Sequence, residues 1–151
     1  MPLKVYLAGG YSTKEKLKTY VEELAAANIT CTSSWLNEPY QADATLATIS
    51  TDAERVKFAM RDLIDINNSD VVVLFTVDPT TPIVRGGRHF EAGYTFALQI
   101  TGYLGGGPKL VICGPRENIF YYLPQITVIP TWDVCLKYLK NGAVEASQEV
   151  Q

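Results

Sequence analysis

Five short apolar runs alternate with segments whose apolar residues recur at helical spacing. The runs are "LKVYLAGG", "NITCTSSW", "DVVVLFTV", "KLVICG" and "ITVIP". The third run is continuous and rich in β-branched residues, which is typical of a strand covered on both faces in a parallel sheet. Parallel neighbours need crossover connections, and these are nearly always right-handed. The pattern therefore predicts an α/β fold with a single-domain, doubly wound, five-stranded parallel sheet of flavodoxin-like order 2-1-3-4-5.

Four segments between and after these runs predict helices. Ser12 with Glu15 matches a capping box, and Thr51 with Glu54 matches a second one. The last segment, "TWDVCLKYLKNG", has Thr131 as its cap and Gly142 as its stop. The predicted apolar stripes are Leu17, Tyr20, Val21, Leu24 and Ala25; then Val56, Ala59, Met60, Leu63 and Ile64; then Phe90, Tyr94, Ala97 and Leu98.

Length and composition favour one compact domain over residues 1–142 with a short tail at 143–151. The net charge is -3 with no basic block, so a nucleic acid polymer is not expected as a partner. No apolar stretch reaches the length of a membrane span and no leader pattern opens the chain, which predicts a cytoplasmic protein without a membrane partner. The three cysteines are far apart and predict neither a disulfide framework nor a zinc site. We expect no cofactor.

In sheets of this kind, ligands bind beyond the carboxyl ends of strands one and three. That crevice would be lined by "AGGYST" and "TVDPTTPIVRGGRHFE". Glu91 falls near the first turn of the helix after strand three, where unpaired N–H groups favour a negative charge, so we expect it to be ionised. It could be a base, a metal ligand or a nucleophile, or its charge could only interact favourably with the helix dipole. No second carboxylate or histidine lies at metal-ligand spacing, so no metal site is predicted.

Three segments carry a resemblance to a known family. "KVYLAGGYS", "RDLIDINNSDVVVLFT" and "GGRHFEAGYTFAL", in this order and spacing, resemble the nucleoside 2-deoxyribosyltransferase family and its relatives that hydrolyse nucleoside 5'-monophosphates. The resemblance runs roughly from residue 4 to residue 130, and its most specific element is G-x-x-x-E-x-G-Y. It implies that Glu91 attacks the anomeric carbon of a (deoxy)ribonucleoside and releases the base. A second base as acceptor then gives transfer, and water gives hydrolysis.

The same resemblance implies roles for other residues. Tyr6 would hold the nucleophile in position, and Tyr11 would lie against the base beside the substrate-binding Gly9 and Gly10. Asp62, eight residues before Asp70, would contact the base and help protonate it on departure. Each residue also has an ordinary interpretation. A first-strand tyrosine can be core, a loop tyrosine can be surface, and Asp62 can be a solvated helix residue at the edge of an apolar stripe.

The chain also departs from the family. The transferases carry an aspartate shortly before the glutamate, whereas the nearest one here is Asp78, thirteen residues upstream. Cations and glycines stand in its place: Arg85, Gly86, Gly87, Arg88 and His89. Glycine N–H groups and arginine suit an anion, so the segment predicts a 5'-phosphate pocket with Arg88 as the expected contact, one helical turn from Glu91. The alternative is that these cations balance Glu91 or face solvent.

Two further segments bear on substrate and assembly. "GPREN" follows strand four, where Arg116 or Asn118 could reach a nucleotide or a subunit contact, or could form a turn with a helix cap. No clear match near "YYLPQIT" replaces the asparagine that a neighbouring subunit donates in some members of the family. The apolar "IFYYL" is wider than one helical stripe needs, and we expect a homodimer or larger homo-oligomer.

Three classes of function remain open from the sequence. The first is an N-glycosidic enzyme that acts on a nucleoside or nucleotide substrate. The second is a nucleotide-binding protein without chemistry, and the third is a flavodoxin-like interaction or signalling module. Glu91 separates the first from the others. A related phosphoribohydrolase pattern, P-G-G-x-G-T-x-x-E, is a poor match, because "VRGGRHFE" lacks its proline and threonine.

Overall fold

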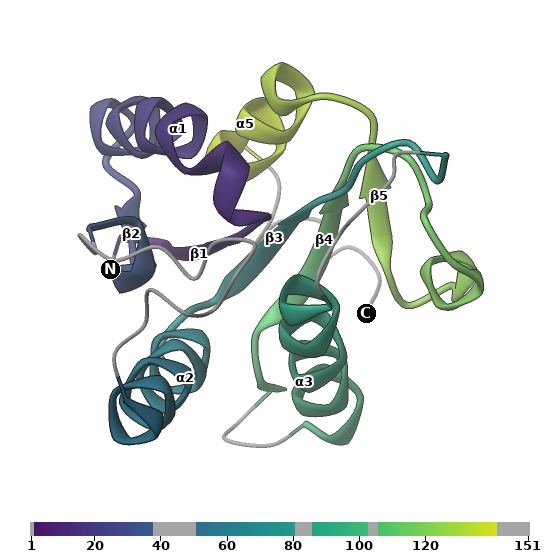
Figure 1. Ribbon diagram of the computed structural model, residues 1–151. Coiled ribbons are helices and arrows are strands. Elements are labelled where there is room, and N and C mark those ends of the chain that lie inside the picture. The colour runs from purple at the N-terminus through teal and green to yellow at the C-terminus, as the bar shows by residue number, and fades with distance from the viewer. Residues whose placement is uncertain (1, 38–50, 81–85, 103–105, 142–151) are drawn as a thin grey trace.

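The computed structural model describes residues 2–37, 51–80, 86–102 and 106–141. Its sheet has five strands, all parallel, in the order β2-β1-β3-β4-β5 (Figure 1). The strands are β1 Lys4–Ala8, β2 Thr30–Cys31, β3 Val71–Phe75, β4 Lys109–Cys113 and β5 Thr127–Ile129. The predicted fold class and strand order are therefore confirmed.

Helices cover both faces of this sheet. They are α1 Lys14–Ala26, α2 Asp52–Asn67, α3 Gly87–Thr101 and α5 Trp132–Asn141, with short 3-10 turns η1 Tyr11–Thr13, η2 Ser34–Asn37 and η3 Ile119–Tyr122. In Figure 1, α1 and α5 lie on one side of the sheet, and α2 and α3 lie on the other. Each helix starts near the carboxyl edge of the sheet, because each follows a parallel strand.

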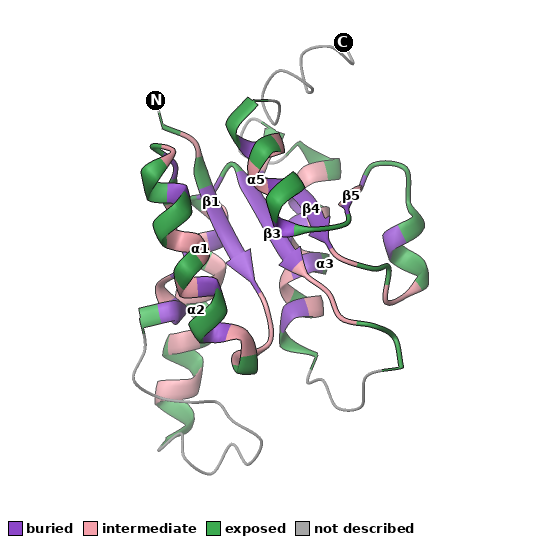
Figure 2. Ribbon diagram, turned by 90° about the horizontal axis from the view of Figure 1, so that it is seen from above, coloured by how far each residue is buried: buried purple, intermediate pink, exposed green. Residues whose placement is uncertain are grey.

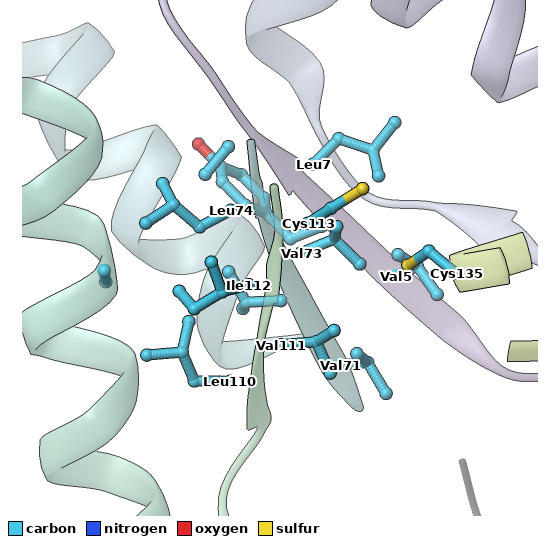
Figure 3. Close-up of a cluster of buried hydrophobic side chains, with 14 of the residues drawn as sticks. Val5, Leu7, Val71, Val73, Leu74, Leu110, Val111, Ile112, Cys113 and Cys135 are labelled. Carbon is cyan, nitrogen blue, oxygen red and sulfur yellow. The ribbon is translucent and has the colours of Figure 1, made fainter. Parts of the chain in front are cut away.

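The core lies on the three middle strands (Figures 2 and 3). Val72 and Val73 of β3 are completely buried although their side chains point to opposite faces. The continuous apolar run is explained by this double coverage, since both faces of β3 need apolar side chains. Burying one such side chain stabilises the fold by roughly 1.5–3 kcal/mol.

Most of the apolar stripe predicted for α2 does not face the core, although Leu63 packs against it. Val56, Met60 and Ile64 are 62%, 53% and 51% exposed. The face toward the sheet instead carries the buried Ile66 and the carboxylate of Asp65, which accepts a hydrogen bond from the Ser34 N–H at 2.9 Å. Helical periodicity shows that a stripe exists but not which way it turns, and here the inward face combines Leu63 and Ile66 with the carboxylate of Asp65.

The prediction for α3 was wrong in part, although Tyr94 packs against the core. Phe90 is 68% exposed and Ala97 is also exposed, whereas Leu98 is buried as expected. The buried residues of the helix are Arg88, Ala92, Thr95 and Leu98. The helix presents a charged side chain and a threonine to the interior, so hydrophobicity alone could not identify its inner face. The helix ends at Gly102, which adopts the left-handed conformation with φ of 65°.

The N-cap hydrogen bond of one of the two predicted capping boxes is present. The Thr51 hydroxyl accepts the Glu54 N–H at 3.1 Å, as predicted. The box at Ser12 is wrong, because η1 occupies 11–13 and α1 starts after Thr13. No side-chain cap bond forms there, and the Thr13 hydroxyl donates to the Gly10 carbonyl at 2.6 Å instead.

Some predictions fall outside the described residues, namely Gly142, Arg85 and the tail at 143–151. The three cysteines are free thiols; Cys113 and Cys135 are buried and Cys31 is half-buried. Within the described ranges, none of the helices combines the length and the hydropathy needed to cross a bilayer.

Candidate active site

Tyr6 and Glu91 meet beneath the α2 and α3 layer. Tyr6 lies in the middle of β1 and is completely buried. Its hydroxyl donates a hydrogen bond to Oε2 of Glu91, which lies on α3. The parallel pairing of β1 with β3 brings these residues together across 85 positions of sequence. One oxygen of the carboxylate is thereby held by a strand of the central sheet.

The electrostatic environment of Glu91 disfavours its charge. Burial raises its pKa to about 8, the hydrogen bond from Tyr6 lowers it in part, and the charge of Asp62 raises it further. The expectation that Glu91 is ionised at neutral pH is therefore wrong. Glu91 is the fifth residue of α3, so it lies beyond the unpaired N–H groups of the first turn, and burial outweighs the dipole.

Asp62 reaches the same place from α2. Its side chain is 27% exposed, and Arg61 lies beside it with Nη2 to Oδ1 at 3.5 Å. Burial raises the pKa of Asp62 to about 6, Arg61 opposes this shift, and Asp65 adds to it. The charge of Asp62 also raises the pKa values of Tyr6 and Glu91. Strand β1 and helices α2 and α3 thus bring the three residues expected to carry chemistry into one cluster.

This cluster can hold one proton between two carboxyl groups. Glu91 and Asp62 titrate at about 8 and about 6, so the pair keeps a single proton between these pH values. Between these pH values Glu91 is the carboxylic acid and Asp62 is the carboxylate. Burial raises the pKa of Tyr6 well above its ordinary value, so its hydroxyl remains a donor. A carboxylate and a proton donor together can attack a carbon centre while protonating a leaving group.

Arg88 and His89 precede Glu91 by three and two residues. Both contact another carboxylate, that of Glu117. Arg88 is buried, and its guanidinium grips Glu117 with Nη1 to Oε1 at 2.5 Å and Nη2 to Oε2 at 2.8 Å. His89 places Nε2 at 3.3 Å from the same Oε2, and its Nδ1 lies 2.5 Å from the Tyr121 hydroxyl. Sequence reasoning missed Glu117, because nothing in "GPREN" indicates a partner 29 residues earlier.

Glu117 joins three segments at the carboxyl edge of the sheet. Besides Arg88 and His89, its Oε1 accepts the Val77 N–H at 2.7 Å. Burial alone would raise the pKa of Glu117, but hydrogen bonds from Arg88 and Val77 outweigh it and lower the pKa. Burial lowers the pKa of His89, Arg88 lowers it further, and Glu117 opposes both. The cluster therefore combines a cation, an anion and a neutral imidazole at pH 7.

The glycines of the predicted site differ in how closely other atoms surround them. A Cβ on Gly9 would lie 2.9 Å from Leu17 Cδ1 and 3.0 Å from Thr13 Oγ1, so the turn after β1 leaves room only for glycine. Gly10 precedes η1 as its N-cap. Gly86 is the N-cap of α3 without any side-chain cap bond, and a Cβ on Gly86 or Gly87 would meet nothing within 4 Å. Among the described residues, no atom therefore crowds Gly86 or Gly87.

Two other predicted residues have local partners. The Tyr11 hydroxyl accepts a hydrogen bond from Lys14 Nζ at 3.1 Å. Asn118 caps η3, since its Oδ1 accepts the Phe120 N–H at 3.0 Å, which is the helix-cap alternative. Arg116 donates from Nε to the Tyr121 carbonyl at 2.9 Å. These contacts order the loops at the carboxyl edge.

A groove of about 1050 Å³ opens at the carboxyl ends of the strands. It includes Gly10 after β1 and Thr76 after β3, as expected for the crevice, and then runs between α1 and α5 past Tyr20 and Trp132. Glu91 and Tyr6 do not line it, because they lie on the other face of the sheet. The carboxylate cluster is the candidate active site, because burial raises the pKa of both Glu91 and Asp62 there. Among the described residues, no three His, Cys, Asp or Glu side chains gather as a metal site would require.

No protein-family profile and no curated protein matches the chain. Solved structures do. A 2-deoxyribosyltransferase from the psychrotolerant bacterium Bacillus psychrosaccharolyticus superposes with a TM-score of 0.55 at 15% identity, covering 89% of this chain and 91% of that one. The CMP N-glycosidase BcmB of Clostridium botulinum gives 0.49 at 16% identity, covering 90% and 97%. The first likeness shows a shared fold over nearly the whole length of both chains.

Proposed function

We propose that this chain cleaves the N-glycosidic bond of a (deoxy)nucleoside or nucleoside 5'-monophosphate, with Glu91 as the nucleophile. The observation that carries the proposal is the cluster of Tyr6, Glu91 and Asp62, drawn from one strand and two helices. The segments that resemble the nucleoside 2-deoxyribosyltransferase family contain all three residues. The fold shared with a 2-deoxyribosyltransferase supports the same class of reaction.

The proposed reaction has two displacements. The single proton of the pair, which Glu91 holds in the free protein, first passes to Asp62. A carboxylate oxygen of Glu91 then forms a bond to the anomeric carbon while the bond to the base nitrogen breaks, and Asp62 gives this proton to the departing base. The sugar is then held as an ester of Glu91. Water or a second base displaces the carboxylate from the opposite side, so the configuration is retained overall. Tyr6 keeps the carboxylate oriented, because its hydroxyl binds Oε2 in the free protein.

The 5' end of the substrate would lie at the N-terminus of α3. The uncapped N–H groups beside Gly86 and Gly87 suit an oxyanion, and they precede Glu91 by about one turn. His89 is 29% exposed and can add a hydrogen bond. Arg88 contacts a phosphate only if that phosphate replaces Glu117, which holds both of its terminal nitrogens. We place the base near Gly9, Gly10 and Tyr11, and Asn118 at the edge of the phosphate subsite.

We also propose that the chain works as a homodimer or larger homo-oligomer. The residues of η3 that point outward are strongly exposed, with Ile119 at 77%, Phe120 at 64% and Tyr122 at 69%. Tyr121 of the same turn is buried, so the exposed side chains are not needed by the chain's own core. Light scattering tests this proposal, and a fully active monomer would contradict it.

The test is a panel of nucleosides and nucleoside 5'-monophosphates, with and without a second free base, followed by chromatography of the released base. We expect the native protein to release the base. Glu91→Gln should lower the rate of base release by at least about 100-fold, because the nucleophile is lost. Glu15→Gln is the matched control, since Glu15 is exposed on α1 and forms a surface ion pair with Lys18.

The other two classes of function predict different results. A binding protein without chemistry would bind nucleotides and release no base from any member of the panel. An interaction module would show no rise in melting temperature with any nucleotide. Either result would contradict the enzymatic proposal. Monophosphates that react better than nucleosides would support hydrolysis, and transfer to the second base would support a transferase.

A further inference from the structure

Glu117 already binds Arg88, the side chain that would best recognise a phosphate. The side chains of Arg88 and Glu117 are only 2% and 10% exposed, and two parallel hydrogen bonds join them. A guanidinium fork binds a carboxylate and a phosphate with the same bidentate geometry. The carboxylate of Glu117 therefore takes the place that two phosphate oxygens would take on Arg88.

The pair is also satisfied on its other sides. Arg88 Nη1 lies 3.5 Å from the Phe75 carbonyl, and Glu117 accepts the Val77 N–H. A phosphate that approached Arg88 would have to break two charge-assisted bonds before it formed its own. Breaking them would also leave the buried carboxylate without its cation, which is unfavourable.

We propose that Glu117 is a specificity-determining residue, an internal anion that withholds Arg88 from the substrate and so limits the preference for a 5'-phosphate over a free 5'-hydroxyl. This inference rests on the proposed function, because it requires the 5' end of the sugar to lie beside the N-terminus of α3. In the native protein the phosphate binds the backbone N–H groups of α3 and His89, and Arg88 positions the loop after β4.

The experiment compares ribose 5-phosphate with ribose as probes, so that the identity of the base does not matter. Calorimetry on the full chain gives both dissociation constants for the native protein and for Glu117→Gln. The glutamine retains an oxygen for the Val77 N–H but removes the charge that neutralises Arg88. We expect the preference for ribose 5-phosphate to rise by at least about 10-fold, the value of one charge-assisted pair. Glu22→Gln, an equal charge change on the exposed surface of α1, should leave the preference unchanged.

A double variant separates charge from structure. Arg88→Gln with Glu117→Gln leaves no unpaired buried charge, so it remains informative if Glu117→Gln alone does not fold. We expect its preference for ribose 5-phosphate to equal that of the native protein, because Arg88 contributes nothing to phosphate binding while Glu117 holds it. A fall of about 10-fold or more in the double variant would show that Arg88 already binds phosphate and would overturn the proposal.

Other outcomes are also decisive. An unchanged or lower preference in folded Glu117→Gln overturns the role of Glu117, and so does the absence of ribose 5-phosphate binding in every variant. If base release fails for all substrates while Glu117→Gln still gains ribose 5-phosphate affinity, the proposed reaction is wrong and the anion subsite stands. If base is released and the preference does not change, the reaction stands and this inference is wrong.

Discussion

Glu91 and Glu117 are two partly buried glutamates at the same end of α3, and their chemical environments are opposite. Glu91 faces a tyrosine hydroxyl and a second carboxyl group, and its pKa rises to about 8. Glu117 faces a guanidinium, an imidazole and a backbone N–H, and its pKa falls. The comparison teaches that the neighbours of a buried carboxylate decide whether it can be reactive or serves as a structural anion.

The cause of the difference is compensation of charge. Burial destabilises the ionised form of both side chains. Arg88 offsets this effect at Glu117, whereas no cation contributes to the pKa of Glu91. Ionisation of Glu91 is therefore unfavourable. Carboxyl groups with strongly shifted pKa values are concentrated at functional sites, because acid–base and nucleophilic catalysis need them. The two glutamates should therefore respond to substitution with opposite signs of stability change.

The largest effect is expected for Glu117→Ala. It leaves the Arg88 guanidinium buried without its partner, which should lower the free energy of unfolding by about 3–5 kcal/mol. Urea unfolding followed by circular dichroism measures this change. Glu22→Ala on the exposed surface of α1 is the control and should change stability by less than about 0.5 kcal/mol. A loss below about 1 kcal/mol for Glu117→Ala would break the contrast between the two sites.

The opposite sign is expected for Glu91→Gln at alkaline pH. The pKa of Glu91 is about 8 in the folded protein against an ordinary value of 4.5. Between these values the unfolded chain releases the proton and the folded chain keeps it, so Glu91 destabilises the fold progressively as pH rises. The glutamine variant should be more stable by a few kcal/mol above pH 8, and by nothing below pH 4.5. Thermal melts across this range measure the gain, and a gain that does not grow with pH would contradict the raised pKa.

A smaller effect is expected for Tyr6→Phe. The hydroxyl orients Glu91 and lowers its pKa, so its loss should reduce kcat about 10-fold with little change in KM.

The dependence of kcat/KM on pH should be bell-shaped in the native protein, with limbs near 6 and 8 from Asp62 and Glu91. In Tyr6→Phe the upper limb should move to higher pH. An unchanged rate and profile would return Tyr6 to a purely structural role in the core.

The architecture that surrounds the candidate site could be predicted from local pattern. The apolar runs predicted five parallel strands and their order, and that topology brings the residues after β1, on α2 and on α3 to one end of the sheet. The roles of the glutamate, tyrosine and aspartate in the proposed reaction came from the family resemblance and not from local pattern. Glu117 could not be found in this way, because its partners lie 29 and 28 positions away on another element.

The sequence by itself determined the sheet, the positions of the turns and the residues available at the carboxyl edge, because strand and helix periods are properties of short segments. Only the tertiary structure decided that Val56, Met60 and Ile64 face outward, and that Arg88 turns inward. It also decided which glutamate received the cation and which did not. The reason is that burial and charge pairing depend on groups brought together from distant parts of the chain, and these interactions set the pKa of each carboxyl group.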